Sequence, residues 1–240
     1  LVGSEMCIRD RTMTGQQLKP MGPLDFEELI DVYKEQIRYL TEAGADLLVV
    51  ETMMSLQESR AALIAAKETC PDIPVMVTMT FESDGRSLFG TDAATAAIVL
   101  SSLGADAVGA NCSTGPDQMA EVIRRMAKVT DIPIIAKPNA GLPSLDEKGQ
   151  TVYDMGPEEF GADMELLLDA GAQILGGCCG TTPEHIRKMT HRLAGRPVPV
   201  HGNLTQRALT SERASLTFDL DGPFLIVGAV SYTHLRAHET

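Results

Sequence analysis

The chain has 240 residues, of which 44% are hydrophobic and 22% are charged, values typical of a soluble globular protein with one large domain. Its formal net charge of −13 argues against a nucleic-acid or anionic-membrane partner, because phosphate groups would be repelled. No stretch approaches the roughly 18 apolar residues of a membrane-spanning helix. The five cysteines are irregularly spaced, which favours a reducing compartment, and we therefore expect a cytoplasmic protein.

The two ends of the chain differ from the rest because they show neither helical nor strand periodicity. Residues 1–12 and 230–240 resemble translated adaptor sequence, so we expect both segments to be non-native tails. Between them we expect one main domain over 13–202, a polar linker over 203–220 and the beginning of a second, truncated domain over 221–229.

The main domain alternates between helical and strand patterns of hydrophobic residues. Short continuous apolar runs, such as 47–50, are typical of strands buried on both faces of a parallel sheet. The expected strands cover 46–51, 74–81, 107–111, 133–137 and 172–175, and the expected helices cover 25–44, 55–70, 92–103, 116–129, 157–170 and 183–194. The unit of one strand and one helix recurs about every 30 residues, which predicts parallel strands joined by right-handed crossovers.

The residues that follow the strands distinguish two α/β architectures. Polar or reactive residues follow every expected strand: Glu51, residues 80–84, Asn111 with Cys112, residues 137–141, and Cys178 with Cys179. This pattern predicts one shared mouth, as at the C-terminal face of a barrel. An open doubly wound sheet would concentrate such residues at one crevice. We therefore expect an α/β fold that is a partial (β/α)8 TIM barrel, with about the last five strand–helix units present and the first three strands missing.

Two adjacent thiols stand where the last expected strand turns into a helix. The sequence there is Gly176-Gly177-Cys178-Cys179-Gly180, and its glycines allow positive φ or the close approach of another group. A third thiol, Cys112, follows an earlier strand at the same kind of position. Three soft thiolates favour zinc, and three protein ligands leave a fourth position open, as in catalytic zinc sites. The alternatives are thiols buried as small hydrophobic side chains, or a non-catalytic, redox-active thiol module.

Two charged residues end strands at the same mouth. Glu51 could hold a substrate ammonium group or form a salt bridge at the strand end, and the residues alone do not separate the two roles. Lys137 could form a Schiff base, as in an aldolase-like barrel, although that reaction leaves three cysteines without a role. An open zinc site instead suits a substrate thiol, because coordination to zinc deprotonates the thiol and yields a nucleophile.

At these residues the chain resembles the homocysteine S-methyltransferase family. The matching motifs are Val50-Glu51-Thr52, Gly109-Ala110-Asn111-Cys112, Pro138-Asn139-Ala140-Gly141-Leu142-Pro143 and Gly176-Gly177-Cys178-Cys179-Gly180-Thr181, and the resemblance runs from about residue 14 to residue 201. It implies a (β/α)8 barrel in which Cys112, Cys178 and Cys179 hold Zn2+ and the zinc binds the sulfur of homocysteine. It also implies that Glu51 contacts the substrate ammonium group. Asn111, beside a ligand, is a candidate for contact with the substrate or with the metal ligands, and no catalytic residue is implied beyond the zinc site.

Within the family, the chain is most similar to the homocysteine-binding domain of the cobalamin-dependent methionine synthases. The deciding segment is 221–228, which resembles the entry into the pterin-binding barrel that follows this domain. Betaine-dependent members, the alternative, have no such continuation. The resemblance implies that methylcobalamin on another domain donates the methyl group and is renewed from methyltetrahydrofolate. It also implies that pterin-binding and cobalamin-binding domains of the same full-length chain are partners.

The chain departs from the family pattern at the first strand of the barrel. In the family that strand supplies an acidic residue and glycines that close over the substrate, and this portion is absent here. Missing strands would expose sheet edges and apolar helix faces. We therefore expect the isolated fragment to be inactive and not to fold cooperatively.

Overall fold

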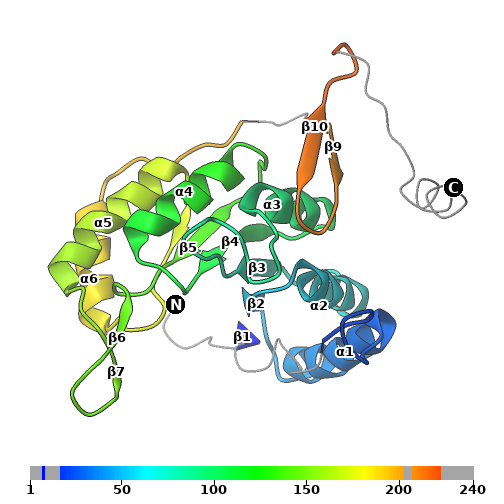
Figure 1. The fold of residues 1–240 in the computed structure, drawn as a ribbon, viewed down its shortest axis with the longest axis horizontal. Coiled ribbons are helices and arrows are strands. Elements are labelled where there is room, and N and C mark those ends of the chain that lie inside the picture. Colours follow the sequence, from blue (N-terminus) through cyan, green and yellow to red (C-terminus); the bar gives the residue numbers. More distant parts are fainter. Residues whose placement is uncertain (1–6, 9–16, 203–206, 223–240) are drawn as a thin grey trace, which may run out of the picture.

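The computed structural model describes residues 7–8, 17–202 and 207–222 of the chain. Its centre is a parallel sheet with the strand order β1-β2-β3-β4-β5-β8, and the helices follow one another around this sheet (Figure 1). The strands of the sheet are β1 (Cys7–Ile8), β2 (Leu48–Met53), β3 (Val75–Met79), β4 (Ala107–Asn111), β5 (Ile134–Lys137) and β8 (Ile174–Leu175). The helices are α1 (Phe26–Glu42), α2 (Leu56–Thr69), α3 (Ala93–Ser102), α4 (Pro116–Ala127), α5 (Pro157–Ala170) and α6 (Pro183–Leu193).

Strands β2, β3, β4, β5 and β8 and helices α1 to α6 occupy the segments that hydrophobic periodicity predicts. β2 lies beside β3, β3 beside β4 and β4 beside β5, and each pair is parallel. Each of these strands is therefore next to its predecessor in the chain, and consecutive helices such as α4 and α5 pack against each other. This order is consistent with part of a (β/α)8 barrel, although the described strands do not form a complete one.

The core is built from aliphatic side chains, because aromatic residues make up 4% of the chain. Val50, Val77 and Ile134 of the sheet and Leu63 and Ile123 of the helices are each 0% exposed. Burial of one such side chain stabilises the fold by about 1.5–3 kcal/mol. No helix among the described residues is long and apolar enough to cross a membrane.

Two antiparallel hairpins are absent from the predicted elements. One pairs β6 (Pro143–Leu145) with β7 (Thr151–Tyr153) in the long loop after β5, and the other pairs β9 (Arg207–Thr210) with β10 (Ser215–Phe218). These strands are short and mostly exposed, so they carry no apolar run that periodicity could detect. β9 contacts α3, so part of the segment expected as a linker, 203–220, is folded onto the domain.

The predicted terminal segments lie mostly outside the described residues. Within residues 1–12, Cys7 and Ile8 are described and form β1, which lies parallel to β2 at an edge of the sheet. Of residues 221–229 the structure describes the first two, and residues 230–240 lie outside it. Two non-native tails and a truncated second domain therefore stay predictions.

Candidate metal centre

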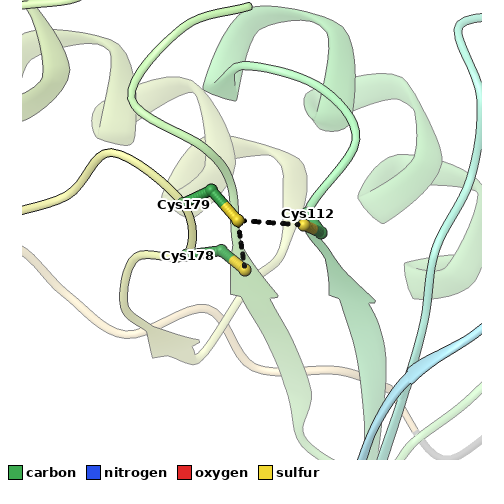
Figure 2. Close-up of side chains that lie close together, drawn as sticks. All are labelled: Cys112, Cys178 and Cys179. Carbon is green, nitrogen blue, oxygen red and sulfur yellow. Dashed lines mark hydrogen bonds between the residues drawn. The ribbon is translucent and has the colours of Figure 1, made fainter. Parts of the chain in front are cut away.

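Three cysteine side chains meet beyond the carboxyl ends of the strands (Figure 2). Cys112 directly follows β4, whereas Cys178 and Cys179 follow β8. The sulfur atom of Cys179 lies 3.6 Å from that of Cys112 and 4.0 Å from that of Cys178, and all three sulfur atoms lie within 4.8 Å of one another. The fold thus brings together the thiols that the sequence singles out, and we call these three residues the thiol triad.

The thiol triad has the chemistry and the spacing of a soft-metal site. In a tetrahedral site with Zn–S bonds of about 2.3 Å, sulfur atoms lie about 3.8 Å apart. The distances of 3.6 and 4.0 Å found here are close to that value. Three protein ligands also leave one coordination position for a further ligand. The triad therefore fits a metal ion such as Zn2+.

The glycines of the 176–180 motif make room for neighbouring side chains. A Cβ atom on Gly176 would lie 3.2 Å from Cγ of Lys137. Gly180 has a φ of +78°, and a Cβ atom there would lie 2.4 Å from the side chain of Tyr153. Larger residues at either position would push the loop that carries two thiols away from these neighbours, which explains why the motif needs glycine.

Two residues of the site adopt the left-handed backbone conformation that residues other than glycine rarely take. The φ angle is +65° at Cys112 and +62° at Thr52, and each costs roughly 1–2 kcal/mol. Hydrogen bonds hold both: the amide of Cys112 donates to the carbonyl of Lys137 at 3.0 Å, and that of Thr52 donates to Oδ1 of Asn111 at 3.0 Å. Strain of this kind is concentrated at functional sites.

Asn111 links the thiol triad to the carboxylate of Glu51 in β2. Its Nδ2 atom donates to Oγ1 of Thr52 at 2.7 Å and lies 3.4 Å from Oε1 of Glu51 and 3.8 Å from Sγ of Cys178. Its Oδ1 atom also accepts a hydrogen bond from Oγ1 of Thr78 at 2.8 Å. The side chain is fully buried, so its amide orientation is fixed by these partners.

Glu51 forms the salt bridge that the sequence offers as one of its two roles. Nζ of Lys137 lies 2.6 Å from Oε1 of Glu51, which is 6% exposed. Contact with a substrate ammonium group therefore stays a proposal. The same ion pair engages the amino group of Lys137, which disfavours the aldolase-like alternative because a Schiff base requires an uncharged amine.

Hydrogen bonding separates the pKa values of the thiol triad. The pKa of Cys178 is lowered to about 6, first because Cys112 donates a hydrogen bond to its sulfur. The same hydrogen bond raises the pKa of Cys112 above its ordinary value, and burial raises it further. Loss of a proton is thus easiest at Cys178, and the thiolate is the form that binds metals.

Two residues beside the thiol triad are missing from the predicted site. Oδ1 of Asn139 accepts a hydrogen bond from the amide of Cys179 at 3.1 Å. Tyr153 of β7 contacts the same cysteine: burial, and then a hydrogen bond with Cys179, raise the pKa of its phenol to about 12. Asn139 lies in the 138–143 motif on which the family resemblance partly rests, so the sequence alone could have indicated it as a site residue. Tyr153 lies in a hairpin that periodicity does not detect.

The chain matches the family described as homocysteine S-methyltransferase over residues 4–193. The chain belongs to this family. The matched segment contains the thiol triad, Glu51 and Asn111, and it also contains β1.

Two curated relatives are methionine synthases. The chain is 32% identical over 219 residues to that of Mycobacterium tuberculosis (strain ATCC 25618 / H37Rv), a match that covers 89% of this chain and 18% of the relative. It is 35% identical over 185 residues to that of Mycobacterium leprae (strain TN), which covers 75% of this chain and 15% of the relative. The chain therefore spans less than a fifth of the length of either protein.

The fold is also similar to that of a solved structure, the homocysteine methyltransferase MmuM from Escherichia coli. The apo form has a TM-score of 0.58 and 23% sequence identity, and the match covers 71% of this chain and 58% of that chain. A metallated form of the same protein gives the same TM-score. At this identity the similarity shows a shared α/β fold.

Proposed function

We propose that this chain carries a zinc-dependent site that accepts a methyl group on the thiol of homocysteine and so forms methionine. The observation that carries the proposal is the thiol triad, whose sulfur atoms lie within 4.8 Å of one another at the strand ends. Membership of the homocysteine S-methyltransferase family supports the substrate. The metallated form of the Escherichia coli homologue supports the use of a metal.

The residues of the triad hold the metal, and the open position receives the substrate. Cys112, Cys178 and Cys179 would bind Zn2+ as thiolates. Bound there, Zn2+ supplies a position at which a substrate thiol loses its proton at neutral pH. The lowered pKa of Cys178 assists loading, because that ligand loses its proton more easily.

We assign Glu51 to the ammonium group of homocysteine and Asn111 to the support of Glu51 and Cys178. Glu51 lies within β2, two residues before its end, with its carboxylate nearly buried, where an ionised oxygen attracts a cation strongly. Asn111 reaches both Oε1 of Glu51 and Sγ of Cys178, so the two ends of the substrate site are connected through one amide. Such partners commonly tune metal affinity tenfold to a hundredfold.

We further propose that the methyl donor is methylcobalamin on another domain of a full-length methionine synthase. In this scheme, methyltetrahydrofolate renews the cofactor, and pterin-binding and cobalamin-binding domains are the partners of this domain. The relatives support the scheme because this chain corresponds to 18% and 15% of their length. We also propose a complete (β/α)8 barrel in that protein and, given the free thiols, a cytoplasmic location.

The test is zinc content together with methionine formation in the complete native protein that carries this chain. The double variant Cys178→Ser, Cys179→Ser should lose the zinc and the formation of methionine from homocysteine. The matched control is Cys70→Ser, because the sulfur of Cys70 bonds to the carbonyl of Ala66 in its own helix and lies outside the triad. Stoichiometric zinc in the double variant would contradict the assignment.

A further inference from the structure

Lys137 crosses the mouth of the sheet to reach Glu51. It ends β5, whereas Glu51 lies in β2, and β3 and β4 stand between them in the sheet. Nζ of Lys137 nevertheless lies 2.6 Å from Oε1 of Glu51. Both side chains must therefore project to the same side of the sheet and meet above the intervening strand ends.

The stem of Lys137 also touches the loop that carries two of the thiols. An added Cβ atom on Gly176 would lie 3.2 Å from Cγ of Lys137 and 3.4 Å from its Cδ, so the stem lies directly over the glycine backbone. The carbonyl oxygen of Lys137 accepts the amide of Cys112 at 3.0 Å. One residue thus contacts both segments of the thiol triad and the carboxylate.

A nearly buried carboxylate needs a close cationic partner. Glu51 is 6% exposed, and removal of an ionised carboxylate from water is costly unless a charge or strong hydrogen bonds compensate for it. The ammonium of Lys137 is 2.6 Å away, much closer than Nδ2 of Asn111 at 3.4 Å. Because a carboxylate accepts several hydrogen bonds, the ion pair is compatible with a second cation from a substrate.

We propose that Lys137 is a positioning residue that holds the carboxylate of Glu51 at a fixed separation from the thiol triad. The site then selects thiols that carry an ammonium group at the spacing found in homocysteine. This inference rests on the proposed function. Lys137 acts through Glu51 and does not touch the reacting sulfur, so its loss should change substrate selection more than turnover.

The test compares two thiols that differ by one ammonium group. Dissociation constants for homocysteine and for 4-sulfanylbutanoate are measured by calorimetry on the zinc-loaded complete protein, together with zinc content, kcat and KM. In Lys137→Met the preference for homocysteine should fall about tenfold or more, as expected for the loss of a charge-assisted contact. Zinc should still bind, and the change should appear mainly as a higher KM for homocysteine rather than as a lower kcat. Lys137→Arg should restore most of the preference, and Lys148→Met, at an exposed lysine of the β6–β7 hairpin, is the matched control.

A second variant separates action through Glu51 from a general structural role. Glu51→Gln should lower the same preference, and its combination with Lys137→Met should lower it little further, because both changes remove one interaction. An unchanged preference in Lys137→Met or in Glu51→Gln, or loss of zinc from Lys137→Met, would overturn the inference. A parent protein that binds zinc but neither binds nor methylates homocysteine would instead overturn the proposed function.

Discussion

At the scale of single residues, the candidate site is one connected set of polar contacts. Asn111 reaches the thiol triad through Cys178 and reaches the carboxylate of Glu51. Lys137 forms an ion pair with the same carboxylate of Glu51. These contacts connect the metal end and the substrate end of the site, so variants must be chosen to separate the two.

Replacement of Asn111 should weaken metal binding directly, beyond any effect that the loss of a buried side chain has on stability. Asn111→Ala removes the amide that donates toward Sγ of Cys178, and metal affinity should fall about tenfold to a hundredfold. The control is Thr78→Val, which removes a donor to Oδ1 of Asn111 but leaves its Nδ2 contacts in place. Competition with a chromophoric chelator measures both affinities. Equal losses in the two variants would show that Asn111 acts through stability alone.

Glu58 is a residue whose charge opposes folding. It is 4% exposed, its Oε2 atom has no hydrogen-bond partner among the described residues, and burial raises its pKa from 4.5 to about 7. Because the folded state holds this proton more tightly than the unfolded state, stability is lost as the pH rises from about 4.5 through about 7.

Glu58→Gln should therefore stabilise the domain at high pH. At pH 8 the gain in the free energy of unfolding should be on the order of 2 kcal/mol, and it should vanish near pH 4, where the parent carboxyl is protonated in both states. The exposed Glu42→Gln is the control and should show no such pH-dependent gain. Denaturant unfolding of this domain within the complete native protein, at the two pH values, provides the measurement, and a gain of equal size at both would contradict the assignment.

Adjacent cysteines with glycines at a strand end are visible in the sequence, and so is Cys112 after another strand. Their meeting could be predicted because parallel strands end at one edge of the sheet. The ion pair between Lys137 and Glu51 could not, since it depends on how far the sheet curves between β2 and β5. The positive φ of Cys112 was equally hidden, because no local rule places a cysteine in that region.

At the scale of elements, the periodicity of hydrophobic residues predicts the helices and the buried strands but not the two hairpins. Short buried apolar runs such as β2 and β3, which alternate with helical segments, are typical of parallel strands covered on both faces. β6 and β7 are largely exposed, so no buried apolar run marks them in the sequence. Tyr153 is the clearest case, because it reaches Gly180 and Cys179 from the end of β7.

The contact between β7 and the thiol loop predicts different effects for two similar substitutions. Gly180 and Gly149 both have positive φ, +78° and +74°, so alanine should cost roughly 1–2 kcal/mol of strain at either. A Cβ atom at Gly180 would also lie 2.4 Å from Tyr153, whereas at Gly149 nothing lies within 4 Å. Gly180→Ala should therefore lower metal affinity about tenfold, and Gly149→Ala should leave it unchanged. Chelator competition measures this difference, and equal affinities would contradict the role of the Tyr153 contact.

At the scale of the whole molecule, the metal would connect two distant parts of the chain. Cys112 follows β4 and Cys178 follows β8, with β5 lying between these two strands in the sheet. The amide of Cys112 bonds to the carbonyl of Lys137 at 3.0 Å, and the amide of Cys178 bonds to that of Pro138 at 2.8 Å. Hydrogen bonds thus hold both loops to the end of β5 and the residues that follow it, and a shared metal would reinforce this connection.

Removal of the metal should loosen these two loops while the rest of the sheet stays folded. Hydrogen exchange of the Cys112 and Cys178 amides should rise at least tenfold after chelation, a loss of about 1.4 kcal/mol in local protection. The internal control is the amide of Leu48, which bonds to the carbonyl of Pro74 at 3.0 Å at the start of β2, the opposite end of the sheet from the triad. Mass spectrometry of peptides that contain these amides, with and without chelator, separates the outcomes. A parallel rise at Leu48 would mean that the metal holds the entire domain together, because local loosening at the triad does not extend to the opposite end of the sheet.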